Sequence, residues 1–217
     1  MLFTVFAGFA RSYFLAGIFR APLPSLIIHF HGAAFTTWIL LLVTQTSLVS
    51  AGRVDIHRRL GIAGFFLACF MVVVGVLAGT NSLVRGSAPP GLDALAFYIV
   101  PLSDMVLFAA LVSFAFRLRR DAAAHKRLIY IATTLLLTAA IARLPFSFSS
   151  RSPARAAILS YVLLLILAAY DLWSTRKIHR VTLWAGALLI FVQQLRGPFS
   201  QTALWHTFAS WVQTHAR

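Results

Sequence analysis

The chain has 217 residues, of which 60% are hydrophobic and only 11% are charged. A typical soluble domain is near half apolar and a quarter charged, so this composition excludes an ordinary soluble fold and favours a membrane protein. The net charge of +14 would suit nucleic acid, but the basic residues lie in short clusters between apolar runs. That pattern indicates membrane topology and contacts with anionic lipid headgroups, and no nucleic acid partner.

Apolar runs recur along the whole chain, and the longest exceed the ~20 residues that cross a ~30 Å hydrocarbon core as a helix. We therefore expect one all-α domain over residues 1–217. It is an integral membrane helical bundle with about seven transmembrane helices, followed by an interfacial helix. The predicted spans are residues 1–10, 27–51, 60–83, 94–116, 128–148, 156–173 and 181–195.

The two ends of the chain differ from the rest. Residues 1–10 are short for a span, and Met1 is followed directly by apolar residues, without the basic region of a cleavable signal peptide. Either the first helix begins inside the membrane or residues precede Met1. Residues 203–213 form an amphipathic tail, with Trp205 and Trp211 on one helical face. This spacing predicts a helix in the interface with its tryptophans at headgroup level, and a short eighth span is the alternative.

The loops after the second, fourth and sixth predicted spans carry 11 of the 19 Lys and Arg residues. Because positively charged loops stay on the cytoplasmic side, we expect these three loops and the N-terminus to face the cytoplasm. The opposite side would hold the turn at residues 21–24, the loop at 86–91 and the segment 148–153.

Asp104 and Arg143 are the charged residues that are hardest to place at a surface. Asp104 lies 13 residues before Arg117, which is roughly 20 Å along a helix. Arg143 lies 16 residues after Arg127, which is roughly 24 Å from the same membrane face. Charges at that depth need a partner, so we expect these two side chains to pair between the fourth and fifth spans. A structural ion pair and a substrate or proton pathway are both open interpretations.

His57 and His125 lie within similar basic clusters, at the entrances of the third and fifth predicted spans. Two neutral imidazoles on neighbouring helices can hold a haem iron or contribute to a transition-metal site. Alternatively, both histidines are amphipathic residues that touch lipid headgroups at the cytoplasmic boundary.

His29 and His31 open the second span on the opposite side. Positions i and i+2 of a helix point about 200° apart, so these two rings cannot hold one ion together. We expect His31 to face the bundle, where His206 of the tail is a candidate partner. Capping or interfacial packing is the alternative for His31.

The absence of certain residue types and motifs from the sequence excludes several kinds of functional site. All five acidic residues are aspartates, which excludes Glu-dependent zinc protease motifs and Glu-x-x-His di-metal bundles. Cys69 is the one cysteine and can form no internal disulfide. The sequence contains no Walker loop, nucleophile elbow, dinucleotide fingerprint or CxxC motif, so no motif favours an enzyme.

Several stretches together resemble a group of bacterial polytopic membrane proteins with no assigned activity. The resemblance is carried by Phe6-Ala-Gly-Phe-Ala-Arg-Ser-Tyr-Phe, Pro22-Leu-Pro, His29-Phe-His-Gly, Trp38, Gln45-Thr, the stretch from Gly52 to Gly61, and His125-Lys-Arg-Leu. It implies a helical bundle in the bacterial inner membrane, with a first helix longer than the one here. A weaker analogy is with four-helix di-haem cytochromes. These cytochromes carry two histidines on one helix. In this chain Thr44 and Gln45 occupy the positions where the second histidine on the helix of His31 is expected.

The sequence favours a non-enzymatic membrane protein that serves as an accessory or assembly subunit of a larger membrane complex, because its polar groups suffice to organise a bundle. Two alternatives stay open: a haem-b electron carrier that uses His57 and His125, and a small-solute or proton transporter that uses Asp104 and Arg143. The expected partners are the lipid bilayer, anionic lipid headgroups and other membrane subunits.

Overall fold

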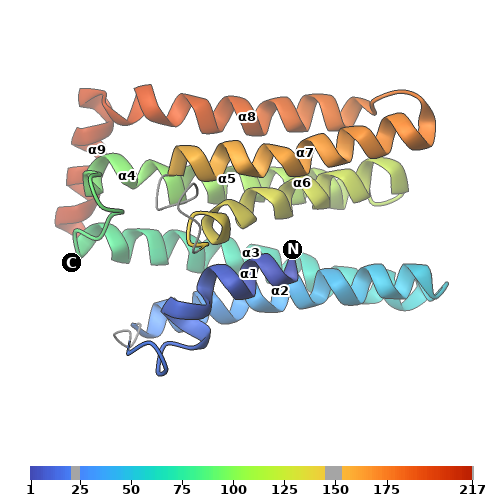
Figure 1. Ribbon diagram of the computed structural model, residues 1–217, viewed down its shortest axis with the longest axis horizontal. Coiled ribbons are helices and arrows are strands. Elements are labelled where there is room, and N and C mark those ends of the chain that lie inside the picture. Colours follow the sequence, from blue (N-terminus) through green and yellow to red (C-terminus); the bar gives the residue numbers. More distant parts are fainter. Residues whose placement is uncertain (21–24, 145–152, 217) are drawn as a thin grey trace.

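The computed structural model describes residues 1–20, 25–144 and 153–216, which are helical almost throughout and include no strand. The long helices run side by side as a bundle (Figure 1). The helices of the described ranges are α1 (Leu2–Phe9), η1 (Ala10–Phe14), α2 (Leu26–Ser50), α3 (Val54–Val84), α4 (Ala94–Phe97), α5 (Ile99–Arg117), α6 (Ala122–Ile141), α7 (Pro153–Thr175), α8 (Arg180–Ser200) and α9 (Ala203–His215).

Within the described residues, four helices are long and apolar enough to cross a membrane. They are α2, α3, the nearly continuous Ala94–Arg117 helix formed by α4 and α5, and α7 from Ala154. The prediction of an all-helical membrane protein is confirmed to this extent, whereas length and composition do not establish seven spans. α6 and α8 have similar lengths but are less apolar on average.

Two helix boundaries differ from the predicted spans in ways that affect the site. α2 ends before Gly52, whose left-handed φ of 73° permits a tight turn into α3. α3 therefore begins at Val54 instead of residue 60 and already contains His57. α8 continues past the predicted end at residue 195 to Ser200, with Pro198 in its last turn. The predicted turn at 21–24 and residues 148–152 lie outside the described residues.

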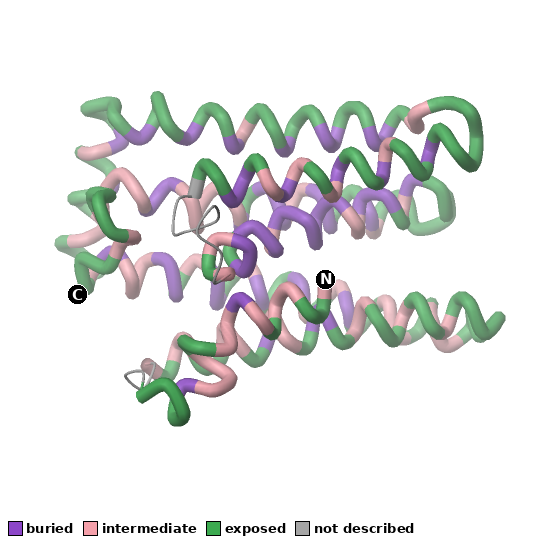
Figure 2. The backbone as a smooth tube through the Cα atoms, in the orientation of Figure 1, coloured by how far each residue is buried: buried purple, intermediate pink, exposed green. Residues whose placement is uncertain are grey.

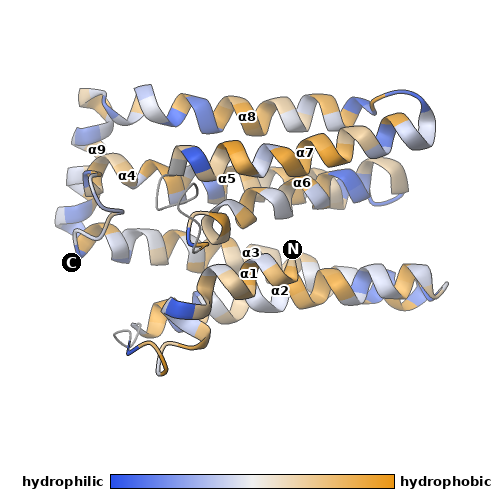
Figure 3. Ribbon diagram, in the orientation of Figure 1, coloured by the Kyte–Doolittle hydropathy of each residue, from blue (hydrophilic) through white to orange (hydrophobic). Residues whose placement is uncertain are grey.

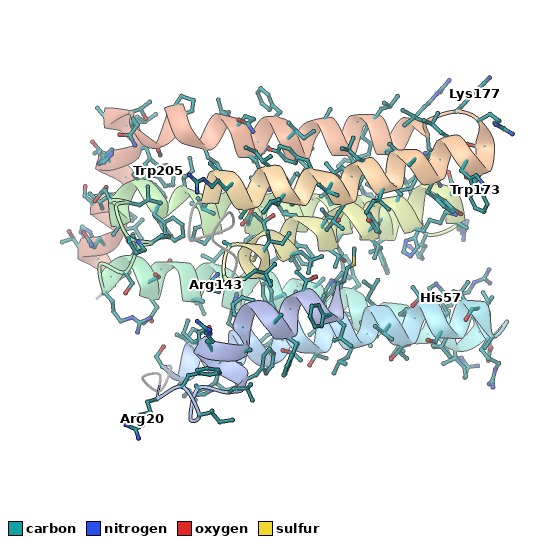
Figure 4. All side chains as sticks on the ribbon, in the orientation of Figure 1. Arg20, His57, Arg143, Trp173, Lys177 and Trp205 are labelled. Atoms are coloured by element: carbon teal, nitrogen blue, oxygen red, sulfur yellow. The ribbon has the colours of Figure 1, made fainter. Side chains whose placement is uncertain are left out.

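The loops that carry the basic clusters lie together at one end of the bundle. The α2–α3, α5–α6 and α7–α8 connections all meet at the right-hand end in Figure 1, and Figure 3 shows hydrophilic residues gathered there. His57, Trp173 and Lys177 are at this end, while Arg20 and Trp205 are at the other (Figure 4). The predicted clustering of these loops on one side is therefore present.

The predicted tail helix exists as α9, but it is anchored differently from the expectation. α9 lies across the ends of α3, α4 and α8. Trp205 is buried and its indole donates a hydrogen bond to the Leu95 carbonyl at 2.8 Å, whereas Trp211 is 58% exposed. Trp205 therefore packs inside the protein, and only Trp211 agrees with a position at headgroup level.

α6 is the central helix of the bundle. It packs against α1, α5, α7 and α8, and most of its residues are buried (Figure 2). Apolar and small side chains occur on all sides of α6, as expected for a helix enclosed by others. α2 lies at the periphery, since only Ala34, Trp38 and Ile39 of its residues are buried.

α1 begins midway along the bundle, where the N-terminus lies in Figure 1. It crosses α6 at Gly8, at which an added Cβ would collide with the Ala140 carbonyl. Glycine is therefore required at this position for α1 to approach the α6 backbone so closely.

Candidate functional site

The structure brings His57 of α3 and His125 of α6 together at the basic end. Their ring centroids lie 6.3 Å apart and the ring planes are nearly perpendicular, at 83°. Both side chains are half-buried. The two helix entrances identified in the sequence thus converge on one pair of imidazoles.

Hydrogen bonds leave imidazole nitrogens of this pair free. His125 Nδ1 lies 2.9 Å from the Ala115 carbonyl oxygen, which can only accept, so Nδ1 carries the proton and Nε2 has its lone pair available. His57 Nδ1 is buried and makes no hydrogen bond within the described residues. Gln45 Nε2 donates to the His57 carbonyl at 3.3 Å, while Gln45 Oε1 is also buried and unpaired.

Two imidazole nitrogens from different helices could bind one haem iron or transition metal. Among the described residues, no group of three or more His, Cys, Asp or Glu side chains could hold a metal ion. Phe65 of α3 and Phe116 of α5 stack with their ring centroids 4.3 Å apart, which joins these two helices.

His31 and His206 do not form a site in the described part of the chain. His31 stacks on Phe35 with a centroid distance of 4.1 Å, and its buried Nδ1 has no hydrogen bond. His206 lies on α9, half-buried, and no contact joins it to His31. His29 instead lies beside Tyr13, with Nδ1 3.4 Å from the hydroxyl oxygen.

The predicted Asp104–Arg143 pair is wrong. Asp104 of α5 forms its ion pair with Arg196 of α8, and both side chains are largely buried, with 14% and 9% exposed. Arg143 is exposed; it lies 4.9 Å from the Phe9 ring centre and donates to the Ala139 carbonyl at 2.8 Å. The physical reason is the length of α8: because this helix extends to Ser200, Arg196 lies inside the bundle instead of in a loop.

A second buried ion pair was missed by the sequence analysis. Arg127 donates to Asp171 Oδ1 through Nε at 2.9 Å and also through Nη2, and the two side chains are only 3% and 0% exposed. Asp171 Oδ2 accepts from the Thr182 hydroxyl at 2.5 Å and from the His179 backbone N–H at 3.0 Å. This one carboxylate therefore joins α6, α7 and the N-terminus of α8.

One signal for this network was present in the sequence. Asp171 is the single acidic residue of the apolar helix that ends beside the basic α7–α8 loop. The sequence analysis expects Arg127 in a loop at the surface, and a surface arginine needs no buried partner. The pair with Asp171 was therefore not predicted.

Comparison of the chain with protein-family models, curated proteins and solved structures finds no match. Its functional interpretation therefore starts from the residues and the geometry described above.

The new pairing predicts unequal effects of removing the two arginines. Arg196→Leu leaves the buried Asp104 carboxylate without its partner and should destabilise the fold by about 3–5 kcal/mol. Arg143→Leu removes a cation–π contact at an exposed side chain and should cost about 1 kcal/mol or less. Thermal unfolding in detergent micelles measures both. The double variant Arg196→Leu/Asp104→Leu should recover much of the loss, and equal destabilisation by the two single variants would contradict the pairing.

Proposed function

We propose that this chain is a non-enzymatic subunit of a larger membrane complex and that a partner's transmembrane helix packs against α5 and α8. The observation that carries the proposal is an open groove between these two helices, lined almost entirely by apolar side chains. Its lining residues include Ile99, Leu102, Val106, Leu188, Val192, Phe199 and Trp205.

The groove suits a helix of apolar sequence. Val106 is 65% exposed and Leu188 is 36% exposed, so side chains of a neighbouring helix could pack between them. In lipid, helices associate through close van der Waals packing and not through a hydrophobic driving force, so a preformed groove favours association.

The interior charges support a structural role. Arg127 is paired with Asp171 and Arg196 with Asp104, so these charges neutralise one another and hold α5 through α8 together. Such pairs organise a bundle without requiring a substrate. The transporter alternative began from an Asp104–Arg143 pair that the chain does not form, and it is not carried forward.

We further propose that the protein spans the bacterial inner membrane seven times, through α1 with η1, α2, α3, α4 with α5, α6, α7 and α8. The basic end would face the cytoplasm, and α1, which begins midway along the bundle, would run away from that end. Three arginine-rich loops at one end of the bundle support this orientation, because such loops resist translocation. Anionic lipid headgroups would then meet the exposed basic residues at this end.

A haem-b electron carrier is the second candidate, favoured by the convergence of His57 and His125. These residues would hold the haem iron, His125 through Nε2, with its ring oriented by the hydrogen bond to the Ala115 carbonyl. A bound haem would supply one-electron transfer. The chain's own contribution would be to orient the two rings at the cytoplasmic boundary.

The proposed orientation predicts one-sided labelling of single cysteines placed in a Cys69→Ser background. With a membrane-impermeant maleimide on intact bacterial cells, Ser87→Cys in the α3–α4 loop should be labelled. Lys177→Cys in the α7–α8 loop should react only after permeabilisation. Both positions are exposed, so access depends on the membrane face alone. The reverse pattern would overturn the orientation.

The proposed interface predicts site-specific crosslinking. A photoreactive residue at Val106 in the groove should give one discrete protein adduct in native membranes. A residue at Val73, which is 57% exposed on α3 outside the groove, is the matched control and should give none. Filling the groove with Leu188→Trp should abolish the Val106 adduct without changing thermal stability. Equal adducts at both positions would refute a specific interface.

The haem hypothesis predicts an absorption spectrum. Purified protein should show a Soret band that shifts on reduction and is lost in both His57→Ala and His125→Ala. His206→Ala serves as the control and should retain the band, because His206 lies on α9, away from the pair. A colourless but fully folded wild-type protein, prepared from haem-replete cells, would exclude this candidate.

A further inference from the structure

Three buried polar atoms on α6 and α8 lack any hydrogen-bond partner within the described residues. They are Thr134 Oγ1 on α6 and Gln193 Oε1 and Arg196 Nε on α8. Their residues are only 0%, 7% and 8% exposed, so neither bulk water nor lipid headgroups reach them. Unsatisfied polar atoms in the hydrocarbon region cost several kcal/mol each, so these atoms require a partner.

The three atoms lie at successive levels along α6 and α8. Gln193 Nε2 donates to Thr138 Oγ1 at 3.5 Å, the outer limit of a hydrogen bond, and this contact places the two residues at the same level. Both helices run in the same direction from the basic end (Figure 1). Thr134 is one turn before Thr138, and Arg196 is about one turn after Gln193. The atoms are therefore spread over roughly 10 Å along the helix axes.

Their chemistry identifies the ligand. Arg196 Nε only donates, Gln193 Oε1 only accepts, and the Thr134 hydroxyl does both. Water can satisfy all three, whereas an anion would meet the Asp104 carboxylate and a cation would meet the Arg196 guanidinium. Reversing the Gln193 amide would only leave its nitrogen unpaired instead of its oxygen.

Toward the basic end, Leu128 and Ile131 of α6 and Leu189 of α8 are fully buried, each with 0% exposed. Along the sequence of α6, these apolar residues separate Thr134 from the Arg127–Asp171 pair.

We propose that a short file of internal water molecules lies between α6 and α8, bridging Thr134, Gln193 and Arg196 and ending on the Arg196–Asp104 ion pair. A span of roughly 10 Å needs two or three waters at hydrogen-bond spacings of about 2.8 Å. This site is independent of the proposed partner helix and of haem.

The sign of a stability change tests the proposal. Thr134→Val replaces the hydroxyl by a methyl group of nearly the same shape. If Thr134 binds water, the substitution breaks that hydrogen bond and the unfolding midpoint should fall by about 2–4 °C. If the interface is dry, the substitution removes an unpaired polar atom and the midpoint should stay unchanged or rise, which would overturn the proposal.

Thr133→Val is the matched control. Thr133 is equally buried on the next position of α6, but its hydroxyl accepts a hydrogen bond from Trp38 Nε1 at 3.2 Å. Loss of this hydrogen bond should lower the unfolding midpoint whether or not water is bound at Thr134. The control therefore shows how large a shift the loss of one hydrogen bond produces. A second measurement is a crystal or cryo-electron microscopy map that resolves water. Ordered density between α6 and α8 in the wild type, lost in Thr134→Val/Gln193→Met, is expected, and a dry interface in the wild-type map refutes the file.

Discussion

A charged side chain buried inside a helical bundle loses its contact with solvent, so another group of the same bundle must neutralise it. The Arg127–Asp171 pair meets this constraint at the basic end, and it joins α6, α7 and the start of α8 through one carboxylate. The Arg196–Asp104 pair meets it again between α8 and α5. The remaining long helices are attached to this frame in sequence, α3 through α5 and α2 through α3.

The apolar helices could be predicted from sequence because length and hydrophobicity are local properties. α2, α3, the α4–α5 helix and α7 all occur within a few residues of the predicted spans. The errors arose where a charge lies inside the bundle. The predicted spans begin after Arg127 and end before Arg196, since an arginine in lipid is costly unless it is paired. Whether it is paired depends on which helices are neighbours. A single sequence does not contain that helix order.

The candidate site was predictable only in part, for the same reason. Two histidines in similar basic clusters had to lie at one face, but their separation depends on how α3 and α6 are placed around α5. The C-terminal helix α9 shows that sequence alone does not reveal what an apolar face packs against. Helical spacing correctly gave α9 an apolar face, yet an apolar face is the same for lipid and for protein, and Trp205 packs against protein.

The Arg127–Asp171 pair also constrains how the chain is made. Arg127 emerges from the ribosome 44 residues before Asp171, an interval of roughly 2–9 s at synthesis rates of about 5–20 residues per second. During that interval α6 carries an arginine that has no counter-charge. α6 and α7 neutralise these two charges only as a pair, so the two helices complete their packing together, after both have been synthesised.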